Sequence, residues 1–170
     1  MQNYPNHTCN NCEGNSDKDD QFSYGQLLLF YTIALPSFIV GVIGLYSFSY
    51  IFLISWGLFC VVFFLVIEIR VLCSHCPNYN KSEFFIRCRA NIGAPKLWKY
   101  RPKSMNIIEK IIMLAGFAIV WGSPAIVIAY RAQWLFFGIY LTTVIFFFII
   151  LGYRFCSKCA NLTCPLNRVR

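Results

Sequence analysis

Residues 21–67 read QFSYGQLLLFYTIALPSFIVGVIGLYSFSYIFLISWGLFCVVFFLVI and contain no charged side chain between Asp20 and Glu68. A helix that crosses a lipid bilayer needs about 20 apolar residues, at a rise of about 1.5 Å per residue. The stretch is therefore long enough for two spanning helices joined by a tight turn. Small residues that favour such a turn lie near its middle: Gly41, Gly44, Ser47 and Ser49.

Two further uncharged stretches, residues 111–130 and 132–153, are each long enough for one pass. The sequence therefore predicts an all-α fold, a polytopic membrane protein whose four transmembrane helices form two hairpins with a cysteine-rich cytoplasmic face. The helices are expected near Tyr24–Tyr46, Tyr50–Leu72, Ile107–Tyr130 and Trp134–Tyr153.

The composition agrees with this class. Of 170 residues, 58% are hydrophobic, 18% are aromatic and 13% are charged, and the mean hydropathy is +0.55. Soluble domains carry about 25% charged residues, so this chain has too little polar surface for a water-facing globule. The composition therefore disfavours a soluble enzyme, a disordered tail and a nucleic-acid-binding domain, despite the net charge of +8.

The predicted organisation has five parts. They are a polar N-terminal tail over 1–23, a first hairpin over 24–72, a basic and aromatic loop with cysteines over 73–106, a second hairpin over 107–153 and a cysteine-rich tail over 154–170. The first part is mildly acidic and lacks the basic start of a secretory signal.

The distribution of basic residues sets the expected orientation. With four passes, all 15 Lys and Arg residues except Arg131 fall on the face that carries both termini and the central loop. The positive-inside rule makes that face cytoplasmic. We therefore expect an inner-membrane protein with both termini in the cytoplasm.

The predicted helices carry no ionisable residue in their middle, and Glu68 and Arg70 lie at the cytoplasmic end of the second. Ion and proton pathways normally require such groups at depth, so a pump or coupled transporter is disfavoured. The histidines, His7 and His75, lie outside the predicted helices, which excludes an intramembrane bis-histidine haem.

Cysteines supply the chemically distinctive pattern. Cys60 falls within the second helix, where a thiol packs as a small hydrophobe. The other eight lie on the predicted cytoplasmic face: Cys9, Cys12, Cys73, Cys76, Cys88, Cys156, Cys159 and Cys164. Three pairs have C-x-x-C spacing, which lets two thiolates converge on one metal ion or close a small disulfide ring. The candidate metal ligands are Cys73, Cys76, Cys88, Cys156, Cys159 and Cys164, with a possible second, weaker site at Cys9 and Cys12.

The cysteines also indicate an internal repeat. Each predicted hairpin ends in a basic residue followed by C-S-x-C, as C-S-H-C from Cys73 and C-S-K-C from Cys156, and a third cysteine follows each motif. Both hairpins enter the membrane from the same side, so the halves would be parallel repeats related by an axis along the membrane normal.

Several chemistries fit these thiols. A disulfide network is disfavoured in a reducing cytoplasm. A four-thiolate zinc site from Cys73, Cys76, Cys156 and Cys159 matches tetrahedral geometry. An iron–sulfur cluster is the alternative, although the C-x2-C-x4-C-P tail departs from the ferredoxin spacing. Labile redox or soft-metal-binding thiols are the third possibility, and His75 is expected to be a neighbouring or exposed residue and not a ligand.

The loop segment EFFIRCRANIGAPKLWKYRPK, residues 83–103, interleaves basic and aromatic side chains. Beside a bilayer this pattern favours the lipid interface, with docking of a cytoplasmic or membrane protein as the alternative and no nucleic acid expected. Asn106 and Glu109 predict a capping box that opens the third helix.

Three segments carry a resemblance: CSHCPNY from Cys73, RCRANIGAPKLWKYRP from Arg87 and FCSKCANLTCPLNRV from Phe155. From about Arg70 to its end, the chain resembles a group of uncharacterised four-helix, cysteine-rich prokaryotic membrane proteins. The resemblance implies no activity.

The leading hypothesis is a binding or assembly role built on a cytoplasmic thiolate site holding zinc or an iron–sulfur cluster. The alternatives are a membrane electron carrier or thiol oxidoreductase, and a heavy-metal-handling protein. Nothing in the sequence supports a hydrolase.

Overall fold

The computed structural model describes residues 24–76, 79, 84–86, 94–159, 161–162 and 164–168. The predicted tail over 1–23 lies outside the described residues, as do the candidate ligands Cys9, Cys12 and Cys88.

The described chain is helical, and its β pairing is limited to an isolated bridge between Phe85 and Pro95. Four helices are long and apolar enough to cross a membrane, so this part of the sequence-based prediction is confirmed. The elements are α1 (Tyr24–Phe48), α2 (Tyr50–Val62), the π-helical η1 (Phe63–Ile67), α3 (Glu68–Val71), the 3₁₀ turn η2 (Cys73–His75), α4 (Ile107–Tyr130), α5 (Trp134–Ile150), the π-helical η4 (Leu151–Phe155) and the 3₁₀ turn η5 (Cys156–Lys158).

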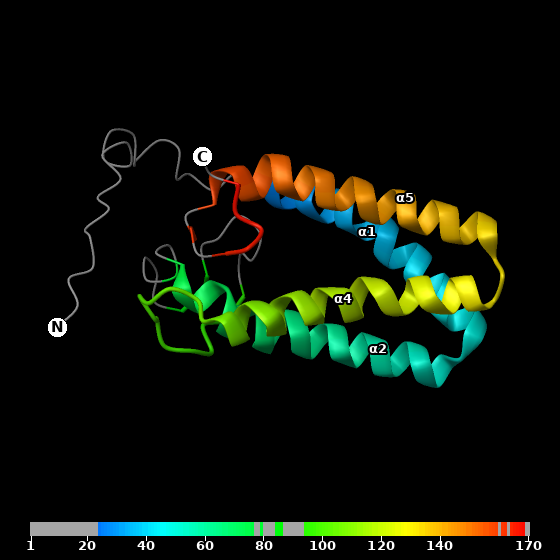
Figure 1. Cartoon of the computed structure of the whole chain (residues 1–170), viewed down its shortest axis with the longest axis horizontal. Helices are drawn as coiled ribbons and strands as arrows, with labels where there is room; N and C mark the ends of the chain where they lie inside the picture. Colours follow the sequence, from blue (N-terminus) through cyan, green and yellow to red (C-terminus); the bar gives the residue numbers. More distant parts are fainter. Residues whose placement is uncertain are drawn as a thin grey trace.

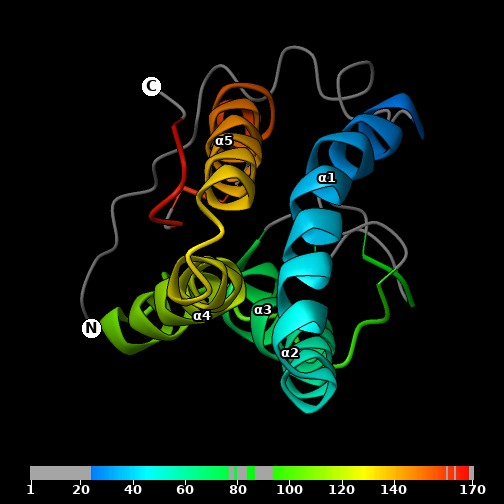
Figure 2. The same ribbon diagram turned by 90° about the vertical axis from the view of Figure 1, so that its right-hand side faces the viewer.

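The α1 and α4 helices form the middle of the bundle. Each contacts the other and both α2 and α5, as the two views show (Figures 1 and 2). The short turns at Ser49 and at residues 131–133 lie at one end of the bundle. In the second turn Ala132 has φ of 53°, a left-handed conformation that costs a non-glycine residue roughly 1 kcal/mol.

Near Pro124, α4 accepts side-chain hydrogen bonds from two neighbouring helices. Proline has no N–H, so it leaves the carbonyl four residues earlier, Val120 O, without its helical donor. The indole N–H of Trp56 donates to Val120 O (3.0 Å), and the Tyr140 hydroxyl donates to the next carbonyl, Trp121 O (2.8 Å). Backbone groups inside a bilayer must be satisfied by protein, so α2 and α5 each supply a donor to α4.

Two glycines allow close helix crossings. A Cβ on Gly116 would lie 1.8 Å from Phe63 Cε2, and a Cβ on Gly44 would lie 2.4 Å from Ile128 Cγ1. The absence of a side chain at these two positions lets the helices approach closely. Cys60 is buried in the same core, as expected for a packing thiol.

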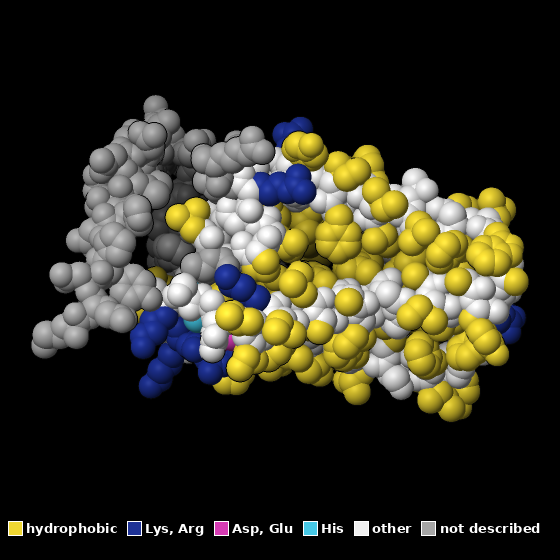
Figure 3. All heavy atoms as spheres, viewed as in Figure 1, with side chains coloured by type: hydrophobic (Ala, Val, Ile, Leu, Met, Phe, Trp, Pro, Cys, Tyr) yellow, Lys and Arg dark blue, Asp and Glu magenta, His cyan; other side chains and the backbone are white. Residues whose placement is uncertain are grey.

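The outer surface of the four helices is apolar over most of its length (Figure 3). Large side chains such as Leu58, Ile126 and Leu135 are more than half exposed. A water-soluble monomer rarely exposes apolar patches of this extent, whereas a lipid bilayer accommodates them.

Candidate metal centre at the cysteine end of the bundle

The α2 arm, made of α2, η1 and α3, ends in η2, and the α5 arm, made of α5 and η4, ends in η5. Both arms end at the same end of the bundle, where α1 and α4 begin and where the described residues of segments 94–106 and 159–168 lie (Figure 1). We call this the cysteine end. Dark-blue Lys and Arg side chains gather there (Figure 3). Five of the eight predicted face cysteines fall among the described residues of this end, namely Cys73, Cys76, Cys156, Cys159 and Cys164.

The two C-S-x-C motifs have the same backbone conformation. Leu72 and Phe155, which precede them, have φ/ψ of −106/−55° and −102/−51°. The last cysteines, Cys76 and Cys159, have φ/ψ of −79/133° and −80/127°. In both turns the last cysteine N–H donates to the carbonyl of the first cysteine, at 3.0 Å and 3.4 Å.

The serine inside each motif makes the same hydrogen bond to the backbone. Ser74 Oγ donates to Arg70 O and Ser157 Oγ donates to Tyr153 O, each at 2.5 Å and each four residues back. Side chains at i and i+3 of a 3₁₀ turn are eclipsed, so the two cysteines of each motif share one face.

The surroundings of the first turn are closed. Cys73 and Cys76 are 4% and 6% exposed and pack with Ile69, Tyr79 and Ile86. The Tyr79 hydroxyl donates to Trp98 O (2.7 Å). Burial raises the pKa of Tyr79, the hydrogen bond at Trp98 acts in the opposite direction, and the charge of Cys73 raises it further.

His75 connects the first turn to the start of α4 through contacts of both ring nitrogens. Its side chain is 1% exposed, and Nε2 lies 3.2 Å from Glu109 Oε2. Nδ1 lies 2.6 Å from Lys103 O, and because a carbonyl only accepts, Nδ1 carries a proton. Both ring nitrogens therefore lie close to protein oxygens.

Glu109 is held by several donors at once. Its Oε2 accepts from Asn106 N–H (2.9 Å) and its Oε1 from Arg101 (2.5 Å). Asn106 Oδ1 accepts from Ile107 N–H (2.7 Å), and the predicted capping box is confirmed. The carboxylate that caps α4 is thus the same group that contacts the histidine of C-S-H-C.

The second turn is more open. Cys156 and Cys159 are half-buried, and the tail that follows folds back over them. Arg168 N–H donates to Cys156 O (3.2 Å), and Asn167 Nδ2 donates to Cys159 O (3.0 Å). The described end of the tail, Asn167 and Arg168, is therefore bonded to the carbonyl groups of the motif.

Asn161 joins the two turns. It is 3% exposed, and its Nδ2 donates to Leu72 O (3.1 Å), the carbonyl directly before Cys73. Its own carbonyl accepts from Asn167 Nδ2 (2.7 Å) and from Cys164 N–H (3.3 Å). The cysteine loop of the tail is thus bonded to the backbone at the start of the first motif.

Cys164 lies in a different environment from the two pairs. It packs against the cluster of Val71, Met105 and Met113. Burial raises the pKa of its thiol, the N–H groups of Leu166 and Asn167 act in the opposite direction, and the charge of Glu68 raises it further. In this conformation Cys164 is therefore less ready than an exposed thiol to become a thiolate.

The described residues do not complete a metal-binding cluster. Within them, no group of three or more His, Cys, Asp or Glu side chains is arranged to hold an ion, and no disulfide joins two of the described cysteines. The candidate set Cys73, Cys76, Cys156 and Cys159 therefore lies at one end of the fold as two pairs and not as one four-thiolate cluster. The described residues do not include Cys9, Cys12 or Cys88. Two described residues on either side of Cys88 in the sequence, Ile86 and Ala94, pack in the hydrophobic cluster that contains Cys73 and Cys76.

The basic and aromatic loop is anchored to the second helix. The Trp98 indole N–H donates to Val66 O (3.2 Å) inside η1, where the π-helical segment departs from the regular hydrogen-bond pattern. The guanidinium of Arg70 lies 4.9 Å from the Trp98 ring centroid, and Lys96 Nζ lies 4.9 Å from that of Tyr79. Aromatic rings paired with cations suit the headgroup region of a bilayer.

Comparison with known proteins adds no relative, because no family model, curated protein or solved structure matches the chain. The resemblance to uncharacterised four-helix, cysteine-rich membrane proteins stays a prediction.

Three positioning residues carry no sequence signal for the contacts that they make in the structure. Glu109 was predicted only as a cap, Arg101 only as an interfacial cation, and Asn161 lies in an Asn-Leu-Thr triplet with no local signal. The two motifs differ at one position, which is histidine in C-S-H-C and lysine in C-S-K-C. This difference is a sequence signal that the first turn makes a contact that the second does not, and the contact is that of His75 with Glu109.

Proposed function

We propose that the chain is a multi-pass inner-membrane protein that holds a thiolate-ligated metal, zinc or an iron–sulfur cluster, at a cytoplasmic cysteine end, in a binding or assembly role. The observation that supports this best is the closely similar backbone conformation of the two C-S-x-C turns, each a 3₁₀ turn with a cysteine at its start and a cysteine directly after its end. Two thiolates from each turn supply the four sulfur ligands that structural zinc sites use.

We further propose that the two halves of the chain are parallel repeats, each a hairpin that ends in a C-S-x-C turn. Supporting this, α1 and α4, the first helix of each half, take the same central place in the bundle. Asn161 and Leu72 provide a direct bond between the two turns. A repeat of this kind favours one site shared between the halves and built from the two pairs, and Cys88 and Cys164 are the remaining candidate ligands.

The metal content of anaerobically purified protein tests this proposal. We expect a metal in a fixed ratio to the chain, either zinc without colour or iron with a brown chromophore. Cys73→Ser and Cys156→Ser should each remove it from a shared site, whereas loss of half the metal in each would indicate one site per half.

Cys60→Ser is the matched control, because this thiol lies in the helical core, and we expect it to retain the metal. A wild-type protein that holds no metal and takes up none under reducing conditions would contradict the proposal.

A thiol oxidoreductase is the second candidate, and the half-buried Cys156 and Cys159 pair favours it. A metal-free protein whose C-S-x-C pairs oxidise and reduce reversibly at a defined potential would support this role over metal binding.

The cytoplasmic orientation is part of the proposal and rests on the basic residues at the cysteine end. Among the described residues, Arg131 alone of the basic side chains belongs to the opposite end. A variant with Arg131→Cys as its single cysteine should react with a membrane-impermeant maleimide in intact cells. A variant that keeps only Cys9 should react after lysis, and labelling of Cys9 before lysis would reverse the orientation.

A further inference from the structure

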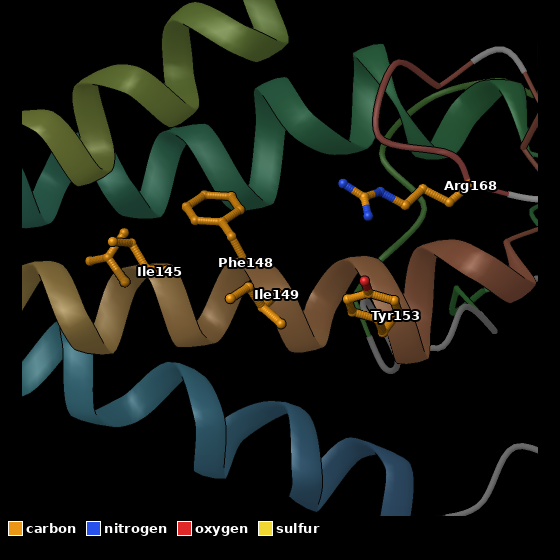
Figure 4. A pocket seen from close by; sticks show the side chains of 6 residues that line it. Ile145, Phe148, Ile149, Tyr153 and Arg168 are labelled. Carbon is orange, nitrogen blue, oxygen red and sulfur yellow. The ribbon is translucent and has the colours of Figure 1, made fainter.

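A groove of about 620 Å³ runs along one side of α5, where Phe148 also contacts Phe117 and Trp121 of α4, and it ends at the cysteine end. Its lining is apolar except at one end, where a guanidinium closes it (Figure 4). The lining residues are Val144, Ile145, Phe148, Ile149, Tyr153 and Arg168.

The position of Arg168 is set by several contacts. Its N–H donates to Cys156 O, which holds the tail against the end of the α5 arm. Its side chain crosses Gly152, where a Cβ would lie 3.6 Å from Nε, and its guanidinium carbon lies 5.8 Å from the Tyr153 ring centroid. Figure 4 shows the guanidinium directed from the tail toward Phe148 and the groove.

The location fixes the chemistry of the ligand. The candidate membrane span of the α5 arm ends at Phe155, so a bilayer that covers this span meets water near Tyr153 and Arg168. Among the described residues no carboxylate pairs with Arg168. An arginine that no described carboxylate pairs with, next to an apolar groove on the surface of the helices, is complementary to an anionic amphiphile.

We propose that this groove binds one anionic phospholipid, with its phosphate on Arg168 and an acyl chain along Phe148 and Ile145. The guanidinium offers two parallel N–H donors to phosphate oxygens, and the exposed Ile145 and Ile149 side chains provide the apolar wall. This site is separate from the cysteine pairs and does not depend on whether they hold a metal.

Native mass spectrometry of the full chain in detergent, titrated with phosphatidylglycerol, tests the proposal. We expect wild type to retain one phosphatidylglycerol in preference to phosphatidylcholine. Arg168→Gln should weaken this binding about fivefold, the loss expected for one basic side chain near a lipid surface, and Arg168→Lys should retain most of it. Ile145→Trp, which fills the groove with apolar bulk, should weaken the binding as well.

Arg154→Gln is the matched control, because this exposed arginine ends the same arm and does not line the groove. Equal binding by Arg168→Gln and Arg154→Gln would overturn the proposal. Equal retention of phosphatidylcholine would also overturn it, as would full displacement of the lipid by glycerol 1-phosphate, which has the phosphate but no acyl chain. A shift to a dimer mass that Ile145→Trp abolishes, without change in bound lipid, would assign the groove to a second copy of the chain instead.

Discussion

Cys73–Cys76 and Cys156–Cys159 end two long helices with the same 3₁₀ turn and the same serine hydrogen bond, but their environments differ. The first turn is enclosed, and its histidine contacts Glu109 and Lys103 O at the start of α4. The second is half-buried and is covered by its own tail. The C-S-x-C motif therefore sets the local backbone conformation, whereas contacts from distant segments set how rigid and how accessible each cysteine pair is.

The largest expected effect follows from removing the contact that distinguishes the first turn. His75→Ala leaves Lys103 O without its donor and removes a buried partner of Glu109. We expect the free energy of unfolding to fall by about 2–3 kcal/mol, measured by thermal unfolding in detergent. His75→Asn, whose amide mimics Nδ1, should lose less. Equal stability of wild type and His75→Ala would mean that the first turn is not held by this contact.

The second largest expected effect on stability comes from the hydrogen bond between Asn161 and Leu72 O, which joins the two turns. Asn161→Asp replaces the amide donor to Leu72 O with a carboxylate oxygen, so a buried repulsion takes the place of a hydrogen bond. We expect a loss of about 1–2 kcal/mol, and the same unfolding measurement checks it. Leu162→Ala is the control, because the neighbouring side chain is 60% exposed. If both variants unfold at the wild-type temperature, the two turns are not coupled through Asn161.

The difference in burial predicts a difference in thiol reactivity. In metal-free, reduced protein we expect N-ethylmaleimide to modify Cys156 and Cys159 about tenfold faster than Cys73 and Cys76, because buried thiols react only after local opening. Peptide mass spectrometry over time measures each rate, and Cys60 provides the buried reference. Equal rates for the two pairs would show that their environments are equivalent in solution.

The smallest effect compares the two serines. Ser74 is fully buried, whereas Ser157 is only half-buried. Ser74→Ala should cost about 1 kcal/mol for the lost hydrogen bond, and Ser157→Ala should cost less because water replaces the donor. A larger loss at Ser157 would reverse the assignment of the first turn as the more rigid one.

The sequence predicted the spanning helices because the information is local. Uncharged stretches long enough for a bilayer identify all four helices, and Asn106 with Glu109 marks the start of α4 at the predicted residue. Both bounds of Ile107–Tyr130 agree with the structure, since a cap precedes it and Arg131 follows.

The candidate site was predictable only in part. The C-x-x-C spacing identified the cysteine pairs, but the π-helical segments η1 and η4 before them have no sequence signature. The contact of His75 with Glu109 and the bond of Asn161 to Leu72 join residues far apart in the chain. Such contacts depend on how the bundle assembles, which hydrophobic periodicity and motif spacing do not encode.

The central claim is that the two C-S-x-C turns supply sulfur ligands to one metal. X-ray absorption spectroscopy of the anaerobically purified, metal-containing protein tests it most directly. We expect a first shell of four sulfur atoms, at about 2.3 Å if the metal is zinc, and loss of the metal from both Cys73→Ser and Cys156→Ser. A first shell of nitrogen and oxygen atoms alone, or a sulfur shell unchanged by both substitutions, would contradict it.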